Sequence, residues 1–288
     1  MRGKIIKGIG GFYYIATDTG IIETKAKGIF RLGGITPTIG DDVLIEMDSD
    51  GTGMISEIFP RKNKMIRPPV ANVDQILVVS SIDQPMINPW LIDKIILLAF
   101  HNEITPKICI NKIDLDIESA KKYKEEYTKS GFDVFLCSTF TGEGIDELKD
   151  HMVGLTTALA GPSGVGKSSI INIMAEVDFE TGIVSDKTKR GKHTTRHVEM
   201  IKYGSDSYIL DTPGFSSLEL DFIEDASEIK SLYPEFVKNS SKCKFMNCNH
   251  YKEPGCEIKK LVELEEIPQF RYDNYISFYD SIMDRRKY

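Results

Sequence analysis

The stretch that decides the fold is GPSGVGKSS at residues 161–169, which matches the phosphate-binding loop pattern GxxxxGK[ST]. An apolar, strand-like run precedes it at 155–160, and helical spacing follows it at 168–175. Glycines let such a loop curl so that its N–H groups point at phosphate oxygens, and the helix start adds its positive dipole end. We expect Lys167 to neutralise the β- and γ-phosphates and the Ser168 hydroxyl to bind Mg²⁺. The residues predicted to contact phosphate are Gly161, Pro162, Ser163, Gly164, Val165, Gly166, Lys167, Ser168 and Ser169.

A second motif, the tetrapeptide NKID at 111–114, follows the strand-like run 107–110. The Asp114 carboxylate can accept hydrogen bonds from N1–H and the 2-amino group of guanine, whereas adenine lacks that amino group and presents an acceptor at N1. We expect Asn111 to join the base edge to the phosphate loop and Lys112 to lie along the base plane. Ser138 and Thr139, after the next strand, are placed to offer a backbone N–H to guanine O6. The pattern predicts a guanine-specific site.

A third motif, the tetrapeptide DTPG at 211–214, also follows an apolar run. We expect Asp211 to hold the Mg²⁺ shell through water and the Gly214 N–H to meet the γ-phosphate. The basic segment KTKRGKHTTR at 187–196 lies between the phosphate loop and this tetrapeptide, so we interpret it as a switch loop whose Thr194 or Thr195 reaches Mg²⁺. Thr195 is the predicted magnesium ligand beside Ser168.

Position 215 is a phenylalanine, which cannot orient an attacking water as a glutamine does. We therefore expect slow intrinsic hydrolysis that needs an external trigger. His193 or His197 are alternatives for positioning the water, although solvent exposure is the simpler role for each.

The order along the chain of the phosphate loop and the two tetrapeptides is unusual. In an ordinary GTPase the phosphate loop comes first and the base-reading segment follows. Here 111–114 precedes 161–169, which precedes 211–214. The order predicts a circularly permuted GTPase.

The pattern of the chain changes twice. Short β-like runs at 12–16, 21–25, 43–47 and 53–58 predict a small all-β barrel, and a plain β domain that only packs on its neighbour is the alternative. After Pro68 and Pro69, strands and helices alternate as in a doubly wound α/β domain. From about 221 the sequence is polar and helical. We place the domain boundaries at 1–62, 63–220 and 221–288.

Three of the five cysteines cluster with a histidine near the end of the chain. Three thiolates and one imidazole suit a closed tetrahedral zinc site, which leaves no open position for catalysis. The predicted ligands are Cys243, Cys248, His250 and Cys256. Free thiols near a surface histidine are the alternative.

Composition sets limits on the partners. The formal net charge is −7 over 288 residues, which argues against a protein that coats nucleic acid with its whole surface. Residues 1–70 carry ten Lys/Arg against eight Asp/Glu, a net of +2, so a local basic face remains open. The longest apolar run, 95–100, is too short to cross a bilayer, and no secretory signal is evident. We expect a cytoplasmic monomer without membrane contact.

The chain resembles the RsgA family (also called YjeQ or YloQ) of bacterial GTPases that depend on the small ribosomal subunit. The resemblance spans essentially the whole chain. It rests on NKID at 111–114, STFTGEG at 138–144, GPSGVGKSS at 161–169, GKHTTRHVEM at 191–200, DTPGF at 211–215 and CKFMNCNHYKEPGC at 243–256.

The resemblance implies an N-terminal OB-fold, a central permuted GTPase and a C-terminal zinc-binding domain. It also implies GTP hydrolysis to GDP and phosphate that the small subunit stimulates, late in maturation of that subunit and with its rRNA as partner. Some members have a histidine several residues after the DTPG segment, whereas 216–222 has none here. Two alternatives stay open: a nucleic-acid-binding scaffold whose guanine nucleotide site never turns over, and a P-loop ATPase or kinase, against which Asp114 argues.

Overall fold

The structure is a computed structural model that describes residues 1–28, 30, 35–47, 52–176, 198–204, 206–212 and 220–285. The chain divides into two compact units, which are described separately. The first unit holds Met1–Ile76, Lys149–Leu159 and Lys167–Phe215, and the second holds Leu77–Leu148, Ala160–Gly166 and Ser216–Tyr288. Within the described ranges no helix is long and apolar enough to span a bilayer.

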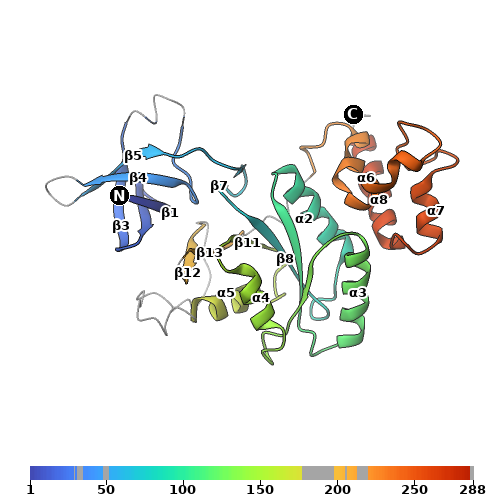
Figure 1. Ribbon diagram of the computed structural model, residues 1–288, viewed down its shortest axis with the longest axis horizontal. Helices are drawn as coiled ribbons and strands as arrows, with labels where there is room; N and C mark the ends of the chain where they lie inside the picture. The colour runs from blue at the N-terminus through green and yellow to red at the C-terminus, as the bar shows by residue number, and fades with distance from the viewer. Residues whose placement is uncertain are drawn as a thin grey trace. The chain divides into compact units, whose positions relative to one another are not determined.

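The first unit begins with a closed five-stranded barrel, as the β-like runs predict (Figure 1). Its strand order is β1-β2-β3-β5-β4, and its core consists of branched aliphatic side chains such as Ile15, Ile45 and Ile55. The strands are β1 (Arg2–Ile9), β2 (Phe12–Thr17), β3 (Gly20–Ala26), β4 (Asp42–Met47) and β5 (Gly53–Ile58). The sequence pattern misses β1 because a register shift between Ile5 and Lys7 breaks its alternation of buried and exposed residues.

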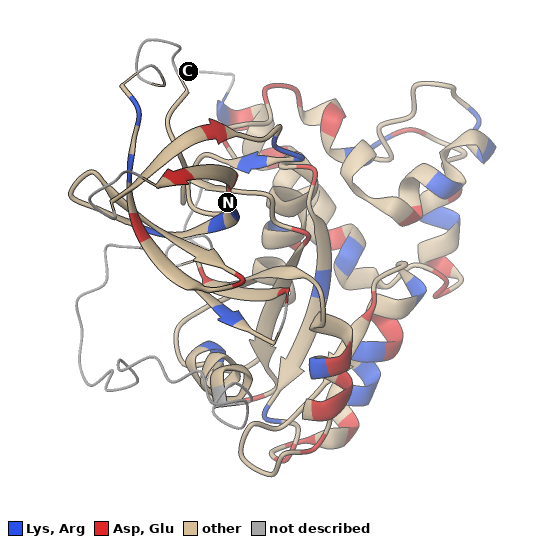
Figure 2. Cartoon of the chain, turned by 60° about the vertical axis from the view of Figure 1, so that its left-hand side comes forward, with Lys and Arg blue, Asp and Glu red and all other residues tan. Residues whose placement is uncertain are grey.

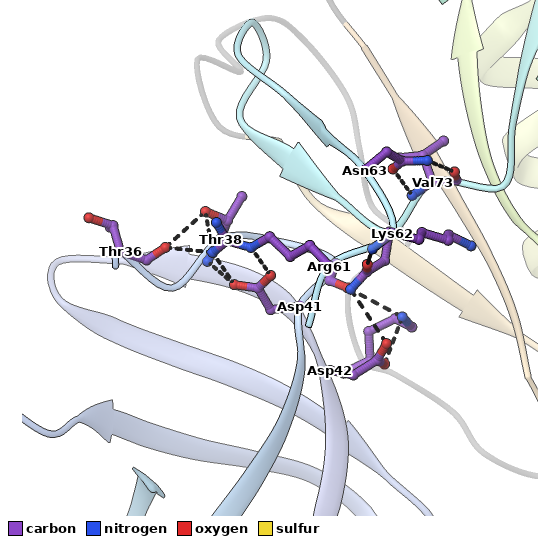
Figure 3. Close-up of polar contacts among 11 residues, drawn as sticks. Thr36, Thr38, Asp41, Asp42, Arg61, Lys62, Asn63 and Val73 are labelled. Atoms are coloured by element: carbon purple, nitrogen blue, oxygen red, sulfur yellow. Dashed lines mark hydrogen bonds and ion pairs between the residues drawn. The ribbon is translucent and has the colours of Figure 1, made fainter. Parts of the chain in front are cut away.

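A polar network fixes the chain where it leaves the barrel (Figure 3). The fully buried carboxylate of Asp41 accepts from Arg61 Nε at 2.6 Å and from Arg61 Nη2 at 2.7 Å, and it also accepts from the Thr38 N–H at 2.7 Å. Beyond Arg61, the Asn63 amide exchanges two hydrogen bonds with the backbone of Val73. This network makes the segment after β5 a structured connection, where Pro68 and Pro69 alone predict only a linker. Its short strands are β6 (Lys64–Met65) and β7 (Val70–Ala71).

Six further strands form one sheet in the order β10-β9-β8-β11-β13-β12. β9 pairs in parallel with β10 and β11 in parallel with β13, while β12 and β13 form an antiparallel hairpin. The strands are β8 (Gln75–Ser81), β9 (Thr105–Asn111), β10 (Val134–Leu136), β11 (Thr156–Ala160), β12 (Met200–Tyr203) and β13 (Ser207–Asp211). All seven residues of β8 are buried, which explains its nearly continuous apolar sequence.

Among the described residues, the helices of this α/β region are α2 (Pro89–His101), α3 (Ile117–Lys129), α4 (Ile145–Met152) and α5 (Lys167–Glu176). α2 starts where Asn88 accepts the Leu91 N–H at 3.2 Å. α3 starts at Ile117, because the Asp116 carboxylate caps it by accepting the Ser119 N–H at 3.0 Å.

The C-terminal part is helical, as predicted, and is drawn in orange to red in Figure 1. Its elements are the 3-10 helices η3 (Ala226–Leu232) and η4 (Ser240–Lys242) and the α-helices α6 (Pro234–Asn239), α7 (Glu257–Glu263) and α8 (Gln269–Arg285). Lys/Arg and Asp/Glu positions are interspersed along the helices and do not separate by sign (Figure 2).

Replacing Arg61 with alanine is expected to destabilise the barrel by about 3 kcal/mol, because it leaves the buried Asp41 carboxylate without its cation. Hydrogen exchange of the β1–β5 amides measures this loss directly. Lys27→Ala is the control, since its ion pair with Glu46 is exposed and contributes at most about 1 kcal/mol. Equal exchange in the two variants would contradict a structural role for Arg61.

Candidate guanine-nucleotide site and metal site

The side chain of Asn111 connects several of the predicted nucleotide-binding residues within the second unit. It lies fully buried at the end of β9. Its Nδ2 donates to the Val165 carbonyl at 2.8 Å and to Thr139 Oγ1 at 3.3 Å, while its Oδ1 accepts the Thr139 N–H at 3.1 Å. One amide thereby ties the phosphate loop to the loop after β10, two segments that are distant in sequence.

Asp114 lies in the exposed loop just beyond Asn111. Its Oδ1 accepts a hydrogen bond from the Ser138 hydroxyl. The same hydroxyl accepts the N–H groups of Phe140 at 3.3 Å and Thr141 at 3.1 Å. The carboxylate is therefore held in place by Ser138, while Asp114 remains exposed to solvent.

Three of the expected donors form hydrogen bonds within the protein instead. The backbone N–H groups of Ser138 and Thr139, one of which we expected to face guanine O6, donate to the Glu143 carbonyl at 2.9 Å and to Asn111 Oδ1 at 3.1 Å. Lys112 has a positive φ of 61°, and its ammonium donates to the Gln84 carbonyl. The roles of Thr139 and Lys112 toward guanine stay predictions.

The loop 82–86, which follows β8, is a part of this region that sequence reasoning missed. Ser81 Oγ donates to the Pro85 carbonyl at 2.6 Å, and the carbonyl of Gln84 holds Lys112. Gly164 of the phosphate loop lies close to Pro85, since a Cβ placed on Gly164 would be 3.7 Å from Pro85 Cδ. Pro85 is the one signal in the sequence, and it marks only a turn.

Glycine is required at both ends of the phosphate loop. Gly161 has φ +149° and Gly166 has φ +102°. A Cβ would lie 2.0 Å from the Val79 carbonyl oxygen at the first position and 2.1 Å from Asn111 Nδ2 at the second. A side chain at 166 would therefore push Asn111 away from Val165. Of the loop residues, Val165 is buried, Gly161, Pro162 and Gly166 are half-buried, and Ser163 and Gly164 are exposed.

The first unit holds the residues expected around Mg²⁺. α5 begins at Lys167, and Ser168 and Ser169 are exposed in its first turn. Burial lowers the pKa of Lys167, and the Asp211 carboxylate opposes that shift. β11 and β13 are parallel neighbours with Leu159 opposite Asp211, so Asp211 lies at the same sheet edge as the strand end that leads into the phosphate loop. Thr194, Thr195 and Gly214 lie outside the described residues, as do 187–196 and Phe215.

The four predicted zinc ligands come together in the second unit. One possible ligand atom from each of Cys243, Cys248, His250 and Cys256 lies within 4.8 Å of the others. His250 Nδ1 lies 3.6 Å from Cys243 Sγ and 3.4 Å from Cys256 Sγ. These separations suit ligands that share one tetrahedral metal ion.

The surroundings of the cluster are compatible with a bound metal. Burial lowers the pKa of His250 to about 4, so the imidazole is neutral, which is the form that binds a metal. Burial raises the pKa of Cys248 and Cys256, so a cation is needed to stabilise their thiolates. Backbone N–H groups of His250 and Glu257 donate to Cys248 Sγ and Cys243 Sγ, each at 3.4 Å. The donor set therefore fits Zn²⁺, and as a closed set it fits a structural ion.

Two family models match the chain. The RsgA GTPase model covers residues 58–221, and the RsgA N-terminal domain model covers residues 2–55. A relative from Clostridium beijerinckii, named small ribosomal subunit biogenesis GTPase RsgA, is 46% identical over 289 residues, covering 100% of this chain and 99% of its own. The chain belongs to the RsgA GTPase family. A relative of the same name from Bacillus cereus is 42% identical over 291 residues, covering 99% and 98% of the two chains.

Solved RsgA structures have the same fold. The crystal structure of YloQ, described as a circularly permuted GTPase, has a TM-score of 0.83 at 39% identity and covers 99% of this chain and 95% of its own. YjeQ from Thermotoga maritima has a TM-score of 0.84 at 34% identity, with 98% of each chain covered. The circular permutation, the barrel and the helical C-terminal part predicted from the sequence are thus confirmed.

Asp114→Asn is expected to lower GDP affinity about 100-fold, since two hydrogen bonds to a charged acceptor, each about 1.5 kcal/mol, are lost or reversed. Affinity for xanthosine diphosphate should rise instead, because an amide donates to the 2-oxo group. Competition against a fluorescent GDP analogue measures both. Asp150→Asn, the same change at an exposed site on α4, is the control. Unchanged selectivity in Asp114→Asn would rule out this carboxylate as the guanine reader.

Cys248→Ser is expected to release close to one zinc ion per chain and to make 240–264 sensitive to protease, because ligation and local folding are linked. A colorimetric zinc assay and limited proteolysis measure the two effects. Cys137→Ser, at a buried cysteine outside the cluster, is the control and should keep its zinc. Full zinc retention by Cys248→Ser would contradict the ligand assignment.

Proposed function

We propose that this chain is a GTPase that binds the small ribosomal subunit, hydrolyses GTP to GDP and phosphate when that subunit stimulates it, and assists late maturation of the subunit. The names of its relatives support the ribosomal part. The observation that carries the nucleotide part is the Asn111 amide, which binds Val165 of the phosphate loop and Thr139 of the loop that holds Asp114. That connection suits a site that reads base and phosphates together.

Each group of the chain has a role in the reaction, in which water attacks the γ-phosphorus and the bond to the β–γ bridging oxygen breaks. Asp114 selects guanine, and the backbone N–H groups of the phosphate loop, which Pro162 lacks, bind phosphate oxygens. Lys167 neutralises charge on the β- and γ-phosphates. Ser168 and Thr195 would hold Mg²⁺, and Asp211 would contact it through water. A bound Mg²⁺ would neutralise charge on the β- and γ-phosphates. Gly214 would meet the γ-phosphate with its N–H.

The trigger for hydrolysis lies outside the chain in this proposal. Phe215 offers no group that orients water, which favours a residue or rRNA group of the subunit in that role. Guanine nucleotide then controls how long the protein stays on the subunit, since GTP and GDP forms differ in affinity for it.

The finer assignments are part of the same proposal. The barrel, which carries most of the net-positive stretch 1–70, contacts rRNA. Zn²⁺ is structural at Cys243, Cys248, His250 and Cys256, and the protein acts as a cytoplasmic monomer. The boundaries 1–62, 63–220 and 221–288 remain predictions.

Phosphate release decides between this proposal and the alternative, a scaffold whose guanine nucleotide site never turns over. Purified protein should release phosphate from GTP slowly, and small subunits should raise the rate at least tenfold, with no release from ATP. A site that binds GTP but shows no release with or without subunits would support the scaffold instead.

Lys167→Ala is expected to reduce subunit-stimulated hydrolysis at least 100-fold, because the charge that neutralises the terminal phosphates is removed. Single-turnover phosphate release measures the effect. Lys122→Ala, at an exposed lysine on α3, is the control and should keep the wild-type rate. A Lys167→Ala rate within threefold of wild type would exclude this lysine from the reaction.

A further inference from the structure

A buried group of three charges joins the C-terminal helices to the α/β region within the second unit. Arg271 of α8 binds Asp93 of α2 through Nη1 at 2.6 Å and Glu235 of α6 through Nε at 2.8 Å. All three residues are at most 5% exposed. We call Asp93, Glu235 and Arg271 the charge cluster.

Other side chains hold Asp93 and Arg271 of the charge cluster in place, whereas the buried atoms Glu235 Oε2 and Arg271 Nη2 have no hydrogen-bond partner among the described residues. Asp93 Oδ2 accepts from Asn274 of α8 at 2.7 Å, and its Oδ1 accepts from the Tyr127 hydroxyl of α3 at 3.2 Å. The guanidinium lies over two rings, 4.4 Å from the centre of Tyr233 and 5.1 Å from that of Phe132. Every oxygen of Asp93 is therefore matched to a donor from a particular helix.

Such a cluster is a poor source of stability but a good source of orientation. Desolvating three charges costs much of what their attraction supplies, and apolar residues of similar volume often stabilise as well or better. The cluster is directional, however, so a shift of α8 along α2 would leave charges buried without partners. Such a shift is costly, which favours one docked arrangement of the C-terminal helices.

Contacts at the start of the C-terminal segment extend the docking. Phe222 stacks on His101 at the end of α2, with ring centres 3.9 Å apart. Arg285 at the end of α8 pairs with Asp221 at 2.6 Å and donates to the Leu220 carbonyl at 3.1 Å. Phe222 thus adds a contact at the end of α2, and Arg285 joins the end of α8 to the segment that carries Phe222.

The helices that hold the charge cluster flank the guanine-reading segment. β9, which follows α2, ends at Asn111, and α3 is capped by Asp116, two residues after Asp114. Asp93 and Tyr127 therefore sit on the two helices attached to either side of 111–114. A force applied to the C-terminal helices reaches this segment through packed helices.

We propose that the charge cluster locks the C-terminal helices to α2 and α3 as one body through the whole nucleotide cycle. Arg271 and Asp93 are then positioning residues, through which a partner bound to the C-terminal helices acts on Asn111 and Asp114. The positioning role rests on the proposed function, whereas the lock does not.

Trp90, the one tryptophan in the sequence, reports on this lock. Its indole N–H donates to Ser277 Oγ of α8 at 3.3 Å, and its ring lies 5.1 Å from that of Phe278. Emission maximum and acrylamide quenching should be the same in the nucleotide-free, GDP-bound and GTP-analogue-bound protein. A red shift with stronger quenching in any of the three states would overturn the lock.

Arg271→Met tests the positioning role, because it leaves two carboxylates buried without a cation. Trp90 should shift to the red, and subunit-stimulated hydrolysis should fall at least tenfold. GDP affinity and unstimulated hydrolysis should change less than twofold, and zinc should be retained, which separates lost docking from general unfolding. Lys260→Met, at an exposed lysine of α7, is the control.

The triple variant Asp93→Leu, Glu235→Met and Arg271→Met should restore the Trp90 emission and most of the stimulated rate, since an apolar core can dock the helices without charges. Full stimulation in an Arg271→Met protein whose Trp90 is red-shifted would overturn the positioning role. If Arg271→Met does not fold, Asn274→Ala, which removes one hydrogen bond from Asp93, should give the same changes at smaller size, and their absence would overturn the role. If wild type shows no stimulation, the proposed function fails, while the Trp90 comparison across nucleotide states still decides the lock.

Discussion

The amide of Asn111 is the interaction on which the nucleotide site depends. It is buried, and it uses both of its polar atoms to hold the phosphate loop and the loop after β10 together. Gly166 has no side chain because any Cβ would displace that amide, and Ser138, in the same loop as Thr139, holds Asp114. Residues 111, 138–139 and 161–166 therefore form one set of contacts, although they are separated by up to 55 positions.

This dependence explains why circular permutation leaves the site intact. The site is made by strand ends that meet at one edge of a sheet, and their order along the chain does not enter the geometry. What permutation changes is where the chain continues. In this protein the segment after Asp211 leads into helices that dock on α2 and α3 through buried charges, so the C-terminal part is attached to the two helices on either side of 111–114.

Much of this was predictable from the sequence, and the exceptions have physical causes. Loops such as 161–169 and 111–114 predict their own structure because glycine backbones and guanine recognition tolerate few alternatives. The three cysteines and one histidine close together in sequence predict a metal cluster, because few other arrangements bring those side chains together. β1 was not predicted because its register shift interrupts the alternation of buried and exposed residues. α4 was not predicted because it is only eight residues long. The buried charges of Asp93, Glu235 and Arg271 were not predicted, because nothing in the local sequence marks a charged residue that will be buried against a partner 36 or more positions away.

The central claim is that one site reads guanine and holds phosphates through segments joined by Asn111. Calorimetric titration of GDP and ADP into zinc-replete protein tests it most directly. The account predicts a single GDP site per chain and no measurable heat from ADP at the same concentrations. Absence of heat from GDP, or binding of ADP with similar affinity, would contradict it.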